Sequence, residues 1–98
     1  MKIYRGRRTG GTTEVHVERG GVVRPLPLRN DLRNGAPAFE WGYPGSGPNQ
    51  LALALAADVL GDDDAALKHH ERLKPIVEAL SQQQDWELSE TEILVALP

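Results

Sequence analysis

The chain contains no cysteine, which excludes disulfide scaffolds, thiolate metal sites and cysteine nucleophiles. Aromatic residues are also scarce, since only five of the 98 residues are Phe, Tyr or Trp. The longest apolar run, Leu51–Ala57, is far too short to span a bilayer, so we expect no contact with a membrane. The segment Met1–Arg8 lacks the apolar centre of a signal peptide. These absences together predict a cytoplasmic protein.

What is present suits one compact domain over residues 1–98, because hydrophobic residues make up 40% of the chain and charged residues 26%. The net charge of −3 conceals an asymmetric layout. Residues 1–33 carry eight Lys or Arg and three Asp or Glu, whereas residues 34–98 carry three and eleven. Such asymmetry indicates either an electrostatic partner surface or two halves that neutralise each other in the fold.

Short strands dominate the first third of the sequence. A strand is expected at Lys2–Arg5, followed by a flexible connection over Gly6–Gly11. In Thr12–Glu18, valines alternate with Glu and His, which predicts a strand with one buried face. A hairpin turn at Gly20–Gly21 then leads into Val22–Arg24. The result is an antiparallel meander of two or three strands, which needs helices on one face to be stable.

Helices dominate the remainder. The run from Asn49 to Leu60 is rich in Leu and Ala, which predicts a buried central helix with Ser46 or Gly47 as its cap. Asp62–Asp64 begins a second helix, and Pro75 is expected to kink or break it.

Near the C-terminus, Trp86–Leu88 is either a short strand or an extended segment. Ser89–Glu92 has the pattern of a capping box, which predicts a final amphipathic helix. The fold class that follows is α+β, with a small N-terminal antiparallel meander packed against two or three helices.

Four motifs give the chain a resemblance to a known type of domain. They are Pro27–Asn34 (PLRNDLRN), Phe39–Tyr43 (FEWGY), Gly45–Pro48 (GSGP) and Gln50–Ala54 (QLALA). This pattern resembles the signature of a small uncharacterised domain family found in bacterial genomes, phages and mobile elements. The resemblance covers almost the whole chain. It implies no activity, but it does imply the context of an accessory, regulatory or anti-defence protein.

The loop that enters the central helix is the first candidate surface. Free backbone N–H groups at Ser46 and the residues after it can bind an anion, although a purely structural turn explains the same Gly-rich sequence. Trp41 and Tyr43 are residue types that dominate interface hot spots, and they are also residue types that complete a small core. In an extended segment, Phe39, Trp41 and Tyr43 would share one side and form an aromatic wall.

The arginines are the second candidate. The side chains of Arg5, Arg7 and Arg8, with those of Arg29 and Arg33 on a later loop, can make the bidentate contacts that phosphate groups accept. The alternative is internal pairing, in which Arg29 or Arg33 binds Glu40 or Asp58 and fixes the loop on the central helix.

The histidines do not have the spacing of a metal site. His69 and His70 are adjacent and point about 100° apart on a helix, and His16 lies on the outer face of a strand. We therefore expect no metal and no cofactor.

These observations favour a non-enzymatic protein-interaction module, encoded by a phage or mobile element as a regulator or as an anti-defence inhibitor similar to an anti-CRISPR protein. The alternative is a nucleic-acid or phosphate-binding module that uses the basic N-terminal third. A small hydrolase with Glu40 or Asp58 as general base is the least favoured reading. The protein partner and the oligomeric state are not specified by the sequence.

Overall fold

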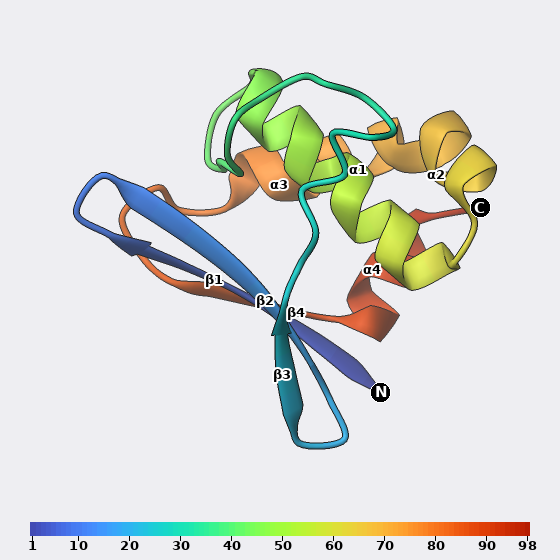
Figure 1. Cartoon of the computed structure of the whole chain (residues 1–98), viewed down its shortest axis with the longest axis horizontal. Coiled ribbons are helices and arrows are strands. Elements are labelled where there is room, and N and C mark those ends of the chain that lie inside the picture. Colours follow the sequence, from blue (N-terminus) through green and yellow to red (C-terminus); the bar gives the residue numbers. More distant parts are fainter.

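An antiparallel sheet with the strand order β3-β2-β1-β4 forms one layer of the molecule, and the helices lie on one side of it (Figure 1). The computed structural model describes residues 1–98. The strands are β1 (Lys2–Thr9), β2 (Thr12–Arg19), β3 (Val22–Pro25) and β4 (Trp86–Ser89). The predicted α+β class is therefore confirmed, and so are the meander and the turn at Gly20–Gly21.

The strand β1 is longer than predicted, because Gly6, Arg7 and Arg8 belong to the strand and not to a flexible connection. Gly6 pairs with Trp86 across β1 and β4, and a Cβ atom on Gly6 would overlap the indole of Trp86. A glycine in a strand interior destabilises the strand, and it is often found where another group approaches the backbone closely. Here that group is an aromatic ring from the far end of the sequence.

The strand β4 adds a fourth strand that the N-terminal pattern could not predict. It pairs with β1 on the side opposite β2, so that β1 becomes central in the sheet. Of the two alternatives for Trp86–Leu88, the strand is correct.

The central helix is α1 (Ser46–Leu60), and its residues from Gln50 to Ala57 are all buried. It begins three residues earlier than predicted, with Gly45 as its N-cap and no side-chain cap. The prediction of Ser46 or Gly47 as the cap was wrong, because both residues lie inside the first turn of α1. Gly47 packs closely against Glu40, since a Cβ atom on Gly47 would lie 2.7 Å from that of Glu40. The helix ends at Gly61, which has a φ of 64°.

The predicted second helix is divided into α2 (Asp63–His69), the 3₁₀ turn η1 (His70–Leu73) and α3 (Lys74–Ala79). The Asp62 side chain caps α2 by accepting a hydrogen bond from the Ala65 N–H at 3.0 Å. Pro75 lies in the first turn of α3, where its missing N–H is tolerated, so the expected break is confirmed. The helix α4 (Glu90–Ala96) has the predicted capping box between Ser89 and Glu92.

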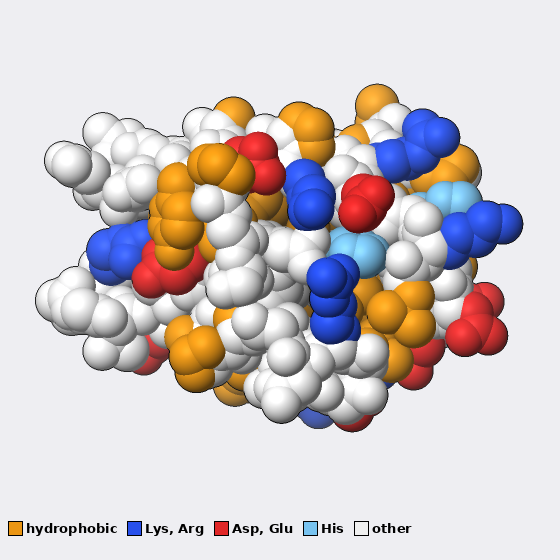
Figure 2. All heavy atoms as spheres, turned by 90° about the horizontal axis from the view of Figure 1, so that it is seen from above, with side chains coloured by type: hydrophobic (Ala, Val, Ile, Leu, Met, Phe, Trp, Pro, Cys, Tyr) orange, Lys and Arg blue, Asp and Glu red, His pale blue; other side chains and the backbone are white.

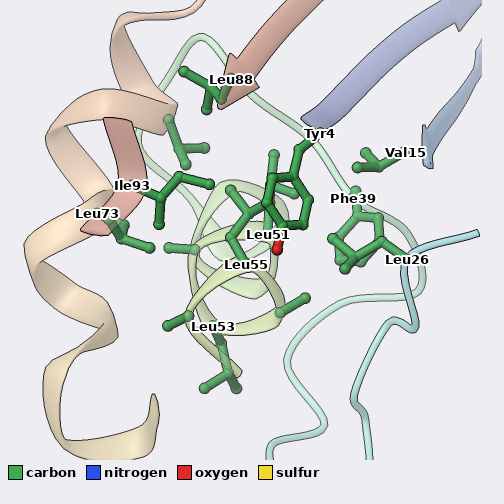
Figure 3. Packing of buried hydrophobic residues seen from close by; sticks show 14 of the residues in the cluster. Tyr4, Val15, Leu26, Phe39, Leu51, Leu53, Leu55, Leu73, Leu88 and Ile93 are labelled. Atoms are coloured by element: carbon green, nitrogen blue, oxygen red, sulfur yellow. The ribbon is translucent and has the colours of Figure 1, made fainter. Parts of the chain in front are cut away.

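The core lies between the sheet and α1. Figure 3 shows Tyr4 of β1 pointing toward Leu51 and Leu55 of α1, with Leu73 and Ile93 on the far side of the helix. All five side chains are at most 1% exposed. None of the helices combines the length and the apolar character that a membrane crossing requires.

Candidate functional site

Arg8, a predicted binding residue, forms its contacts with other residues of the same chain. Its two terminal nitrogens donate to the Glu40 carboxylate at 2.6 and 3.2 Å, and its Nε donates to the Gln82 carbonyl at 2.9 Å. Its guanidinium carbon lies 5.1 Å from the centroid of the Trp41 ring. Hydrogen bonding to Glu40 raises the pKa of Arg8. Arg8 therefore joins the sheet to the loop before α1.

Trp41 is fully buried and cannot contact a partner. Its ring meets Trp86 edge to face, with 5.5 Å between centroids and 84° between planes. The predicted aromatic wall was wrong, because Gly42 has a φ of 88° and turns the chain away from an extended path. As a result Phe39 is buried with Trp41, whereas Tyr43 is 38% exposed. Tyr43 alone of the three aromatics reaches the surface.

Arg29 also pairs internally, although not as predicted. It has a φ of 62° and binds Asp31 through two nitrogens at 3.1 and 3.0 Å, and Asp63 at 3.0 Å. Hydrogen bonding to Asp31 raises the pKa of Arg29, and the same contact lowers the pKa of Asp31. The expected pairing of Arg29 or Arg33 with Glu40 or Asp58 was wrong, because β1 supplies the partners of both carboxylates.

Asp58 is held by two residues of β1. Lys2 donates from Nζ to the Asp58 carboxylate at 3.2 Å and to its main-chain carbonyl at 3.0 Å. The Tyr4 hydroxyl donates to the same carboxylate oxygen at 2.5 Å. Burial, followed by this hydrogen bond, raises the pKa of Tyr4. Since Asp58 lies near the end of α1, Lys2 also complements the helix dipole, and a structural role explains both Asp58 and Glu40 better than a role as general base.

Arg33 and Ser46 come together at the start of α1. They line a polar hollow of about 510 Å³ together with Lys74 and Glu78, and no hydrophobic residue contributes to its lining. Arg33 forms no ion pair and could bind an anion. The carboxylate of Glu78 lines the same hollow and would repel that anion. Arg33 and Ser46 therefore share one surface, but that surface carries both positive and negative side chains.

Arg7 lies on the opposite side of the molecule. We define the open sheet face as the face of the sheet turned away from the helices. Alternation along the paired strands places on it Ile3, Arg5 and Arg7 of β1, Glu14, His16 and Glu18 of β2, Val23 of β3 and Glu87 of β4, with Asp85 beside it. Of the predicted binding residues, Arg5 and Arg7 are on this face.

Arg5 is at the centre of the open sheet face. It lies opposite Glu87 on one neighbouring strand and opposite His16 on the other. Its Nη1 lies 2.7 Å from Glu18 and its Nε lies 3.4 Å from Glu87. The contact with Glu18 raises the pKa of Arg5. The pattern is a cross-strand network of alternating charge on an uncovered surface.

A hollow of about 500 Å³ opens on this face. Its lining includes Arg5 and Arg7, the carboxylates of Glu14, Asp85 and Glu87, and the side chains of His16 and Val23. The sequence analysis missed Asp85 and Glu87 as surface residues of a site. The alternation of Trp86, Glu87 and Leu88 was the available signal, but only the pairing with β1 tells which face Glu87 joins.

Apart from the polar hollow at the start of α1, the helix side of the molecule has no comparable surface. Figure 2 shows positive, negative and hydrophobic side chains scattered over it, with no continuous patch of one charge. Apolar side chains exposed on the helices include Leu67, Leu94 and Val95.

Comparison with known proteins adds one finding. Neither the curated proteins nor the solved structures contain a match to the chain. A family model, described as a family of unknown function (DUF6166), matches residues 4–97. The expected membership of an uncharacterised domain family is therefore confirmed. Because the match covers all but the first three residues and the last, the chain belongs to the DUF6166 family.

Proposed function

We propose that this protein is a non-enzymatic interaction module that binds a protein partner through the open sheet face. The observation that supports this is the hollow of about 500 Å³ on the face of the sheet that no helix covers. Its mixed lining of arginine, carboxylate, histidine and valine side chains resembles the composition of a transient protein interface more than that of an apolar ligand pocket.

The loop Phe39–Tyr43 is a weaker choice for this role. Hot-spot residues act by inserting into a partner, and Trp41 has no exposed surface with which to do so. Tyr43 remains accessible, but it stands alone beside the start of α1. The family-like motif is thus accounted for by folding, and the binding surface lies elsewhere.

Charge indicates the chemistry of the partner. The open sheet face and its rim carry Arg5 and Arg7 against four carboxylates, which gives a formal charge of −2. Of these carboxylates, Glu14 forms no ion pair. A basic protein surface complements this arrangement, whereas the phosphate backbone of a nucleic acid would be repelled by it. The partner we propose is therefore a protein with a basic docking surface.

The resemblance to a domain family of phages and mobile elements supports a role as an accessory protein of such an element. A small accessory protein of such an element would act by occupying a surface of a host protein, as a regulator or an anti-defence inhibitor does. No chemistry is required of it beyond selective binding.

Photo-crosslinking in the producing cell tests the proposal. A benzophenone amino acid is placed at Glu14 or Val23 on the open sheet face, and in separate variants at Glu71 of η1 or Val95 of α4. We expect the two sheet positions to give the same adduct, identified by mass spectrometry as a protein with a basic contact surface. Adducts formed only from Glu71 and Val95, or no adduct from either sheet position, would overturn the proposal.

A further inference from the structure

A second hollow lies on the other side of the β2–β3 hairpin, facing the end of α1. Its volume is about 410 Å³, and its lining consists of Lys2, Val17, Arg19, Val22, Arg24 and Asp58. We call it the basic hollow. The hairpin extends beyond the helices, so this part of the inner face of the sheet is not covered by them (Figure 1).

Strand register brings the two arginines together. Arg19 pairs with Val22 and Val17 pairs with Arg24, so Arg19 and Arg24 are diagonal neighbours on the same face. Diagonal positions of an antiparallel pair are about 7–8 Å apart, which is within reach of long side chains. Both guanidinium groups can therefore approach one ligand group between them.

Neither arginine has a partner within the protein. Six of the eleven Lys and Arg side chains form ion pairs with carboxylates, but Arg19 and Arg24 form none. Two neighbouring positive charges without a counter-charge repel each other, and an anion between them would remove that repulsion.

The carboxylates close to the basic hollow are already occupied. Asp58 accepts from Lys2 and from the Tyr4 hydroxyl through the same oxygen. Glu90, at the neighbouring rim, accepts from the main-chain N–H of Lys2 at 3.3 Å. The lining of the basic hollow thus has three cationic side chains against one carboxylate.

We propose that the basic hollow binds the phosphate group of a small phosphorylated ligand. Arginine presents paired N–H donors that match phosphate oxygens, and two such forks would hold one group from two directions. Val17 and Val22 provide an apolar wall for the body of the ligand. Nucleic acid is a poorer fit, because repeating phosphates need a continuous basic track and the open sheet face beyond the hairpin is acidic.

The binding of adenosine 5′-monophosphate, inorganic phosphate and adenosine, followed by calorimetry and by amide chemical shifts, tests this proposal. We expect saturable binding of the monophosphate, weaker binding of phosphate and none of adenosine. The affected amides should lie in β2, β3 and the first residues of β1. Absence of saturation up to about 1 mM would overturn the proposal, and so would equal binding of adenosine or shifts confined to other elements.

Matched variants separate a specific site from general charge. Arg19→Gln/Arg24→Gln should weaken binding of the monophosphate at least about tenfold, whereas Arg33→Gln/Arg72→Gln, which removes two other unpaired arginines, should leave it nearly unchanged. Equal loss in both double variants would overturn the proposal, as would a short single-stranded DNA that binds at least about tenfold more tightly than the monophosphate. Neither double variant should be less stable than wild type in thermal unfolding, since none of the four arginines has an internal partner. Because the basic hollow and the open sheet face lie on opposite sides of the sheet, failure here leaves the proposed protein interface standing.

Discussion

The Arg8 guanidinium lies over the indole ring of Trp41, 5.1 Å from its centroid, and binds the adjacent Glu40 carboxylate at 2.6 Å. Two residue types that are common at interfaces are thereby used within the protein. At the other end of β1, Lys2 binds Asp58 near the end of α1. One strand is thus tied near one end to the loop before α1 and near the other end to α1 itself, so folding explains these side chains and the opposite face of the sheet is left free for binding.

Arg7 and Arg8 are predicted to differ sharply in their contribution to stability. Arg8→Ala removes a charged hydrogen-bonding pair and a cation–π contact, so we expect a loss of about 1–3 kcal/mol in the free energy of unfolding. Arg7→Ala should cost less than about 0.5 kcal/mol, because its contact with Asp85 is long and exposed. Urea unfolding of both variants measures this. Equal costs would contradict the assignment of Arg8 to the interior contact.

Gly6→Ala is predicted to destabilise the protein by about 1–3 kcal/mol, because the added methyl group collides with the Trp86 indole. Gly11→Ala is the control, since its Cβ atom would meet no atom within 4 Å. Thermal unfolding, together with the fluorescence of the buried tryptophans, follows both changes. If Gly6→Ala were as stable as Gly11→Ala, the packing of Trp86 on β1 would be wrong.

Tyr4 predicts how stability changes in alkaline solution. Burial and the Asp58 contact raise its pKa in the folded protein, whereas an unfolded tyrosine ionises near pH 10. A raised folded pKa means that the contribution of Tyr4 is fully present below about pH 10 and is lost as the pH rises above that value. Tyr4→Phe should therefore be less stable than wild type at pH 7 but should lose stability less steeply above about pH 10.

Urea midpoints for wild type and Tyr4→Phe, measured from neutral to alkaline pH, check this prediction. Other titrating groups are common to both proteins, so the difference between the two curves reports on Tyr4. Curves that remain parallel throughout the range would show that Tyr4 does not have the proposed buried contact.

Local signals in the sequence predicted much of the fold. The alternation of Val15 and Val17 and the glycine pair after Arg19 determine the hairpin, and Ser89 with Glu92 gives the final helix its start. Each of these depends on residues that are neighbours in the sequence. The same alternation, combined with the two-residue turn, is enough to predict that Arg19 and Arg24 lie diagonally opposite each other on one face.

The candidate surfaces were harder to predict because they depend on contacts between distant residues. Gly6 interrupts the pattern of β1, and its small size is explained only by Trp86 from the opposite end of the chain. Without β4 in the sheet, the place of Glu87 could not be known. Gly42 has a similar effect, since its positive φ separates Tyr43 from the buried Trp41.

The central claim is that an acidic open sheet face binds a basic protein surface, and one affinity measurement tests it most directly. The partner identified by crosslinking is titrated with Glu14→Lys/Asp85→Lys and with Glu71→Lys/Glu78→Lys, which makes the same change of charge on η1 and α3. The account predicts at least about a tenfold loss of affinity for the sheet variant and less than about twofold for the control. Equal losses, or a loss only in the control, would contradict it.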